Sequence, residues 1–183
     1  MGDIVLGSPG KTVLSESGGT VSWGTGVPAG SVLQVVSTTK TDFFSTGSTQ
    51  YVDVTGLSAT ITPSSTSSKI LVSVTGAASG SAQNSFAYAV LLRDSTQIAI
   101  GDSRGSAQRA TFDLAQQSAG TVTVWAKHFA IHHLDSPSTT SATTYKLQVK
   151  CTINSVGIGG TWTTSDGNRS NVPTVITLME IAG

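Results

Sequence analysis

One short segment carries the pattern of a catalytic nucleophile. Gly101-Asp102-Ser103-Arg104-Gly105 fits G-x-S-x-G, the turn that exposes the serine of α/β-hydrolases, and Asp113 and His128 follow in the matching order. That chemistry needs a strand-to-helix elbow in a mostly parallel sheet, which holds the serine above the strands. No alternation of strand and helix patterns surrounds the segment. We therefore interpret it as a turn between two strands.

A second segment resembles the end of a phosphate-binding loop. Gly7-Ser8-Pro9-Gly10-Lys11-Thr12 has the terminal Gly-Lys-Thr, but the pattern needs a glycine five residues before Gly10, where Val5 stands. The residues that follow, Val13 to Gly19, contain serines and two glycines that end any helix within one or two turns. No helix N-terminus is then available to hold phosphate, and we reject this interpretation.

The histidines form one group, His128, His132 and His133, with Asp135 nearby. On a strand, His128 and His132 share a face and His133 takes the other. Two ligands on one face are fewer than the three or four of a zinc site, so we interpret these residues as surface histidines and expect no metal or other cofactor. A pH-sensitive contact across a subunit interface is the alternative, because imidazole changes charge near neutrality.

Two further residue types are candidates for carbohydrate chemistry. Glycoside hydrolysis needs two carboxylates roughly 5 to 9.5 Å apart, but most of the aspartates lie next to turn residues, which favours turn-forming and surface roles. Trp125 and Trp162 can stack on sugars or pack in a core or interface, and we favour the packing role. The turn-associated aspartates are Asp42, Asp53, Asp94, Asp102 and Asp166. We expect a protein that is not an enzyme.

The composition is poor in charge and rich in hydroxyl groups. Charged residues make up 11% of the 183 residues, where soluble domains average about 25%, and 54 residues are serine or threonine. Ten basic and ten acidic side chains give no net charge and no basic block, so nucleic acid is not the expected partner. The low net charge also removes the self-repulsion that keeps proteins apart, which favours self-association.

The chain shows no secretion signal and no apolar run long enough for a bilayer. Its longest apolar run, Phe86 to Leu92, is far shorter than the roughly 20 residues that a membrane helix needs. Cys151 is the only cysteine, and the alternation around it places it on an inner face, where we expect an inert buried thiol.

Alternating and β-branched segments, separated by Gly, Ser and Thr clusters, predict strands along most of the chain. Ser106 to Gln117 is the one segment with any helical pattern, and we interpret it as strand and loop. The sequence therefore predicts an all-β fold, an antiparallel β-sandwich with jelly-roll topology. The predicted strands are Val32–Ser37, Tyr51–Val54, Ala59–Thr62, Ile70–Thr75, Phe86–Leu92, Gln97–Ile100, Val122–His128, Tyr145–Ile153 and Val175–Ile181.

The first 30 residues differ from the rest, because their apolar triplets are too short to form a core. We interpret residues 1–30 as an extended arm or small meander that anchors on a partner, and residues 31–183 as the sandwich domain. The candidate anchoring residues are Ile4, Leu6, Val13, Leu14, Val21 and Trp23.

Four strings in residues 31–183 resemble the small β-sandwich virion modules of tailed bacteriophages, particularly phages of cyanobacteria and other aquatic bacteria. They are Val32 to Thr41, Asp53 to Val72, Leu134 to Pro137 with Ser141 to Tyr145, and Thr177 to Ile181. The resemblance implies a homotrimer on the virion exterior, made in the host cytoplasm. It implies either a head decoration (cement) protein or the distal part of a tail fibre or tailspike, and it brings no catalytic residues.

The absence of a shaft favours the decoration role. A fibre normally contains a coiled coil, collagen-like repeats or a β-helix, and this sequence has none of these periods. We expect the major capsid protein or other virion proteins as partners, with host surface polysaccharide as a further contact. A fibre-tip receptor-binding module is the alternative, and a free lectin is a minor one. The candidate core or trimer-interface residues are Val124, Tyr145, Leu147, Val149, Ile176 and Leu178.

Overall fold

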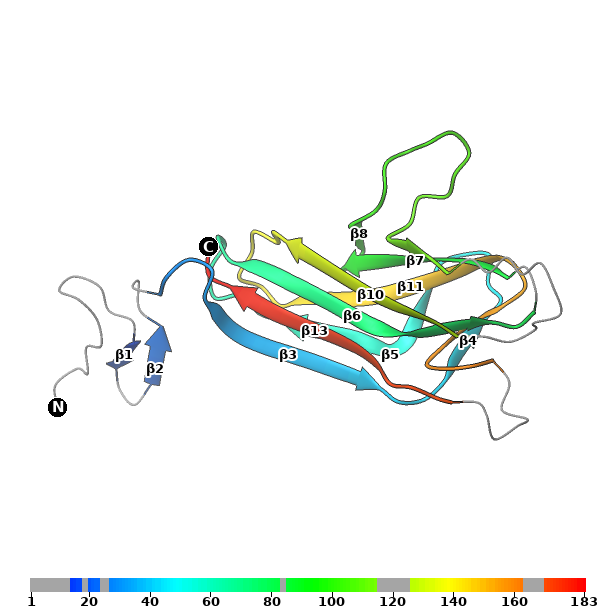
Figure 1. Cartoon of the computed structure of the whole chain (residues 1–183). Helices are drawn as coiled ribbons and strands as arrows, with labels where there is room; N and C mark the ends of the chain where they lie inside the picture. The colour runs from blue at the N-terminus through cyan, green and yellow to red at the C-terminus, as the bar shows by residue number, and fades with distance from the viewer. Residues whose placement is uncertain (1–13, 18–19, 24–26, 83–84, 115–125, 163–169) are drawn as a thin grey trace.

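The computed structural model describes residues 14–17, 20–23, 27–82, 85–114, 126–162 and 170–183 (Figure 1). Within these ranges the chain is all-β: it forms antiparallel strands and no helix, so none of the described segments is a helix that could span a membrane. The predicted all-β class with antiparallel sheets is confirmed.

The larger sheet is organised around two long strands. β13 pairs along its whole length with β3 on one edge and with β6 on the other, and β6 pairs with β10 on its far edge. Two short strands continue the sheet from the end of β6. The members are β3 (Val32–Lys40), β13 (Thr174–Ile181), β6 (Lys69–Gly80), β10 (Ala126–Asp135), β12 (Val156–Ile158) and β4 (Phe44–Thr46).

The smaller sheet has β11 at its centre. This strand pairs with β5 on one edge and with β7 on the other, and the far edge of β7 carries β8 and then β9. The members are β5 (Val52–Ile61), β11 (Thr143–Ile153), β7 (Phe86–Arg93), β8 (Thr96–Ile98) and β9 (Phe112–Asp113).

The hydrophobic core lies between the two sheets, which makes the fold sandwich-like. Alternate residues of each strand point inward, as the period of a strand requires, and β11 and β13 both alternate between buried and partly exposed positions. Each sheet contributes its inner face to one cluster of buried side chains. Five residues singled out from the sequence are fully buried in it: Tyr145, Leu147, Val149, Ile176 and Leu178.

Most predicted strands are present, but their lengths differ from prediction. Tyr51–Val54 and Ala59–Thr62 belong to one strand, β5, which continues through Gly56 with a positive φ of 82° and a register shift opposite β11. Of the strand predicted at Val122–His128, residues 126–128 form the start of β10, which runs on to Asp135, and residues 122–125 lie outside the described residues.

The N-terminal segment contains a separate hairpin. β1 (Leu14–Ser17) and β2 (Thr20–Trp23) pair with each other, and the other described strands pair with neither. The sandwich begins near Gly30, which has a positive φ of 86°. Gly30 donates its backbone N–H to the carbonyl of Ala182, and the N–H of Ala182 donates to the carbonyl of Ser31.

Candidate functional site

An apolar row crosses the outer face of the larger sheet. The register places Val35 of β3 opposite Met179 of β13, Met179 opposite Leu71 of β6, and Leu71 opposite Leu134 of β10. These four residues, here called the apolar row, come from four strands that are far apart in the sequence. The two end residues are among the most exposed large apolar side chains described, with Val35 56% and Leu134 53% exposed.

Hydroxyl groups line one side of the apolar row, and Ile181 and Lys69 lie on the other side. The next row along the strands is Ser37, Thr177, Ser73 and His132, in which the hydroxyls of Ser37 and Thr177 lie 3.0 Å apart. Within the four described strands, the alternation places Lys69 at the end of β6 as the one lysine, arginine or carboxylate on this face. A second protein surface could cover this face without burying a row of unpaired charges.

The histidines follow the predicted alternation on β10. His128 and His132 are exposed on the outer side, and His133 is partly buried on the other. A search of the described residues finds no group of three or more His, Cys, Asp or Glu side chains arranged to hold a metal ion. His132 therefore lies on the outer face, in the row next to the apolar row.

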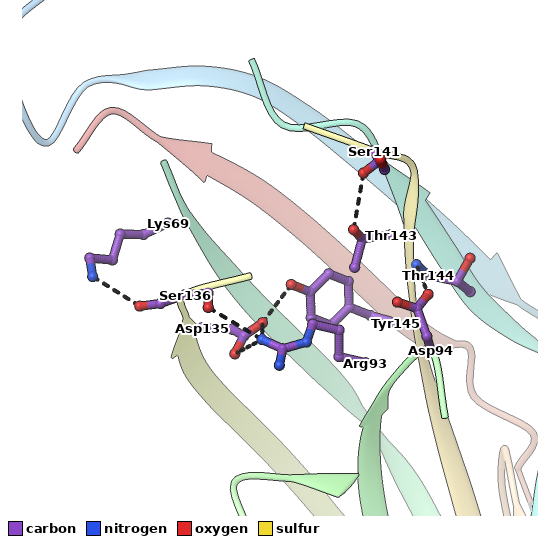
Figure 2. A network of polar contacts seen from close by, with 9 residues as sticks. All are labelled: Lys69, Arg93, Asp94, Asp135, Ser136, Ser141, Thr143, Thr144 and Tyr145. Atoms are coloured by element: carbon purple, nitrogen blue, oxygen red, sulfur yellow. Dashed lines mark hydrogen bonds and ion pairs between the residues drawn. The ribbon is translucent and has the colours of Figure 1, made fainter. Parts of the chain in front are cut away.

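A buried ionic cluster joins the two sheets at one end of the sandwich (Figure 2). Asp135 of β10 accepts hydrogen bonds from Nη1 of Arg93 on β7, at 3.0 and 2.9 Å, and from the hydroxyl of Tyr145 on β11 at 2.7 Å. Burial, together with this bond to Asp135, raises the pKa of the Tyr145 hydroxyl far above its ordinary value, so it remains a donor. Arg93, Asp135 and Tyr145 form the Asp135 cluster.

Nearby polar contacts surround the Asp135 cluster and involve the strand ends. Lys69 Nζ donates to the hydroxyl of Ser136 at 2.9 Å, and the backbone N–H of Thr144 donates to Asp94 at 2.9 Å (Figure 2). Asp135 is 6% exposed and each of its carboxylate oxygens has a protein donor. These contacts indicate a structural role for the cluster, which ties β10 to β7 and β11.

A second buried carboxylate lies in the same inner row of the larger sheet. Glu180 of β13 is fully buried and accepts bonds from Gln34 Nε2 at 2.6 Å and from the N–H and hydroxyl of Ser64 at 2.7 and 2.6 Å. Burial alone raises the pKa of this carboxyl, but the hydrogen bonds from Ser64 and Gln34 outweigh it and hold the pKa below 4.5. Glu180 thereby ties β13 to β3 and to the connection between β5 and β6.

The segment with the nucleophile pattern lies in a loop. Gly101 to Gly105 belong to the connection between β8 and β9, where Ser103 is exposed and no helix follows within the described residues. A cavity of about 360 Å³ opens beside this loop, over Tyr88 of β7. The scaffold of a hydrolase elbow is not present around Ser103.

The structure also places the other residues that the sequence singled out. Cys151 is buried in the core, where burial raises its pKa, and Trp162 makes an edge contact with Phe43 at a centroid distance of 6.0 Å. Asp53, for which we expected a turn or surface role, is exposed, but it lies within β5 and not at a turn, and it accepts a bond from Lys146. Ile4, Leu6, Val13, Val124, Trp125 and Asp166 lie outside the described residues, as do the side chains of Leu14, Val21 and Trp23.

A scan against protein-family models finds no match, and a search of curated proteins finds no similar sequence.

Sequence reasoning missed the apolar row, although a partial signal was present. Val175, Met179 and Ile181 alternate with the buried Ile176, Leu178 and Glu180, so β13 has apolar residues on its outer side as well. A strand with apolar residues on both faces indicates that both faces are packed against other parts of the protein or against a partner. The partners of Met179 in the row could not be assigned, because they depend on which strands pair.

Replacing Arg93 by methionine should destabilise the fold by about 2 to 3 kcal/mol, because Asp135 then keeps a buried charge without its cation. The matched control is Lys146→Met, which breaks the ion pair with Asp53, a carboxylate that is 50% exposed. That change should cost less than about 1 kcal/mol. Urea unfolding measures both, and equal losses in the two variants would contradict the assigned role of the Asp135 cluster.

Replacing Glu180 by glutamine should alter the acid sensitivity of the protein. Because the folded-state pKa lies below the unfolded value, ionised Glu180 contributes stability above pH 4.5 that is lost as the pH falls through the lowered pKa. Wild type should therefore lose stability more steeply than the variant between about pH 5 and pH 3. Unfolding measured across this range tests the prediction, and parallel profiles would argue against it.

Proposed function

We propose that this protein is a non-enzymatic structural protein of the bacteriophage virion exterior. It acts as a homotrimeric decoration (cement) protein on the head, with a jelly-roll sandwich and an N-terminal anchoring arm. The observation that carries the proposal is the apolar row on the outer face of the larger sheet. The resemblance of residues 31–183 to small phage virion modules supplies the biological setting.

The strand order supports the jelly-roll assignment. Apart from the short strands β4, β9 and β12, the sheets read β3-β13-β6-β10 and β5-β11-β7-β8. Successive strands of this set fall in alternate sheets, except that β7 and the three-residue β8 pair with each other in the smaller sheet. Two interleaved Greek keys have this order. Viral capsid proteins and lectins are among the proteins that use jelly rolls.

The apolar row supports self-association through the larger sheet. Four strands of about eight residues make a face of roughly 500 Å². A stable contact buries about 800 Å² on each partner, so the row supplies the apolar centre of an interface and loops supply its rim. Other copies of this chain can bind this face, because a chain with no net charge is not repelled by its own copies. Around a three-fold axis, each copy contacts two others.

The proposed function needs binding and no reaction. A protein that binds the assembled shell more tightly than its free subunits stabilises the shell by mass action. In a trimer, three arms bind the same particle, and once one arm is bound the other two bind at high effective concentration. A weak affinity of each single arm is then sufficient for stable attachment of the trimer. The β1–β2 hairpin lies in this arm, ahead of the start of the sandwich near Gly30.

The alternative function is a receptor-binding module at a fibre tip. The cavity beside the β8–β9 loop favours it, because this cavity lies on the smaller sheet, away from the apolar row. The two functions are compatible on one trimer, with one sheet used for assembly and the other left free.

Replacing Val35 by lysine should dissociate the trimer. The new charge would be buried without a partner in the apolar part of the contact and should weaken association about 100-fold or more. The matched control is Ile153→Lys on β11, where the wild-type side chain is similarly exposed (50%) but outside the row. Sedimentation should give three times 18.6 kDa for wild type and control, and a monomer for Val35→Lys. A monomeric wild type at micromolar concentration would contradict the trimer.

Deleting residues 1–26 should separate folding from attachment. The truncated protein keeps the backbone bonds between Gly30, Ser31 and Ala182, so it should still fold and form a trimer. Purified phage particles should carry many copies of the full-length protein on the head and none of the truncated form, as measured by immunogold labelling. Labelling confined to the tail would favour the fibre-tip function. Absence of the full-length protein from particles, or full retention of the truncated form, would contradict the proposal.

A further inference from the structure

A tethered loop connects β8 to β9 and contacts the outer face of the smaller sheet through Gln108 and Arg109. The β8–β9 connection closes at its base, where the Gly101 N–H donates to the carbonyl of Ala110 at 3.1 Å and Arg109 Nε donates to the carbonyl of Gly101 at 2.8 Å. Figure 1 shows this loop as the green segment that projects beside β8. These bonds join the two ends of the loop.

Two contacts hold the loop against the sheet. Lys150 Nζ of β11 donates to Gln108 Oε1 at 2.8 Å, and the hydroxyl of Tyr51 donates to the carbonyl of Arg109 at 3.3 Å. The ammonium of Lys150 also lies 4.8 Å from the centroid of the Tyr51 ring and 6.0 Å from that of Tyr88. The loop is therefore positioned before any ligand arrives, which lowers the entropic cost of binding.

The space between loop and sheet is a cavity of about 360 Å³. Its volume is near the lower end of the range for small-molecule sites, about 300 to 1,000 Å³, and suits one sugar ring or the end of a chain. Residues of both the sheet and the loop line the cavity, among them Tyr88, Phe112, Asp113, Asp102, Gln108 and Arg109.

The lining chemistry matches a neutral polyhydroxyl ligand. Carboxylates accept hydrogen bonds, a guanidinium donates them and an amide does both, which is the mixture that vicinal hydroxyl groups require. The charges also balance, because Asp113 pairs with Lys127 at 3.3 Å and Asp102 shares the lining with Arg109. A phosphate or nucleic-acid site would need an excess of cations, and a lipid site would need apolar walls.

We propose that this cavity binds a neutral pyranose, as a unit of a larger glycan. Tyr88 lies on the sheet side of the cavity and supplies an aromatic surface for the sugar, while Asp102 and Arg109 bind its hydroxyl groups from the loop. This inference rests on the cavity alone and not on the virion function: a free protein could bind sugar here, and a cement protein could lack this activity.

Saturation-transfer NMR with a defined panel tests the proposal. The probes are the methyl glycosides of glucose, mannose, galactose and N-acetylglucosamine, added to the full-length protein. At least one should bind with a dissociation constant on the order of 1 mM, the affinity expected for a ligand of this size. Absence of binding by all four would overturn the proposal.

Two substitutions locate the binding. Asp102→Ala and Tyr88→Ala should each weaken it about tenfold, since each removes one direct contact. Arg104→Ala is the matched control, because Arg104 is exposed on the same loop but does not line the cavity. Asp102 is exposed, so its variant should fold even where Tyr88→Ala does not. Unchanged affinity in Asp102→Ala and in a folded Tyr88→Ala would place the sugar elsewhere and overturn the proposal.

Discussion

The structure depends on the register of β13 between β3 and β6. In this register Ile176 and Leu178 enter the core, Glu180 meets Gln34 and Ser64, and Met179 joins the apolar row. A shift of one residue would exchange the two faces, placing Met179 inside and the Glu180 carboxylate in solvent. The buried bonds of Glu180 therefore help to fix the outer face as well as the inner one.

The two sheets present different chemistry on their outer faces. The larger sheet has an apolar row with hydroxyl groups along one side, which suits contact with another protein. The smaller sheet has Tyr51, Lys150 and Tyr88 side by side under a tethered loop, which suits a small polar ligand. Between them, the Asp135 cluster joins β7 and β11 of one sheet to β10 of the other, so each face has a rigid support.

Sequence patterns predicted the parts of the fold in which alternation runs for many residues. The predicted strands at Ile70–Thr75, Tyr145–Ile153 and Val175–Ile181 correspond to β6, β11 and β13. β4 and β12 were missed, because three residues are too few to show a period and Gly157 interrupts the pattern. The apolar row and the Asp135 cluster could not be predicted, because each joins strands whose pairing or packing the sequence does not display.

We propose that the apolar row is covered in the assembled protein. Hydroxyl-radical footprinting of Leu134 and Ile153 tests it directly, because the two side chains are about equally exposed in the single chain, at 53% and 50%. With each rate normalised to that of the unfolded protein, we expect strong protection of Leu134 and little protection of Ile153. Equal labelling of the two residues would contradict it.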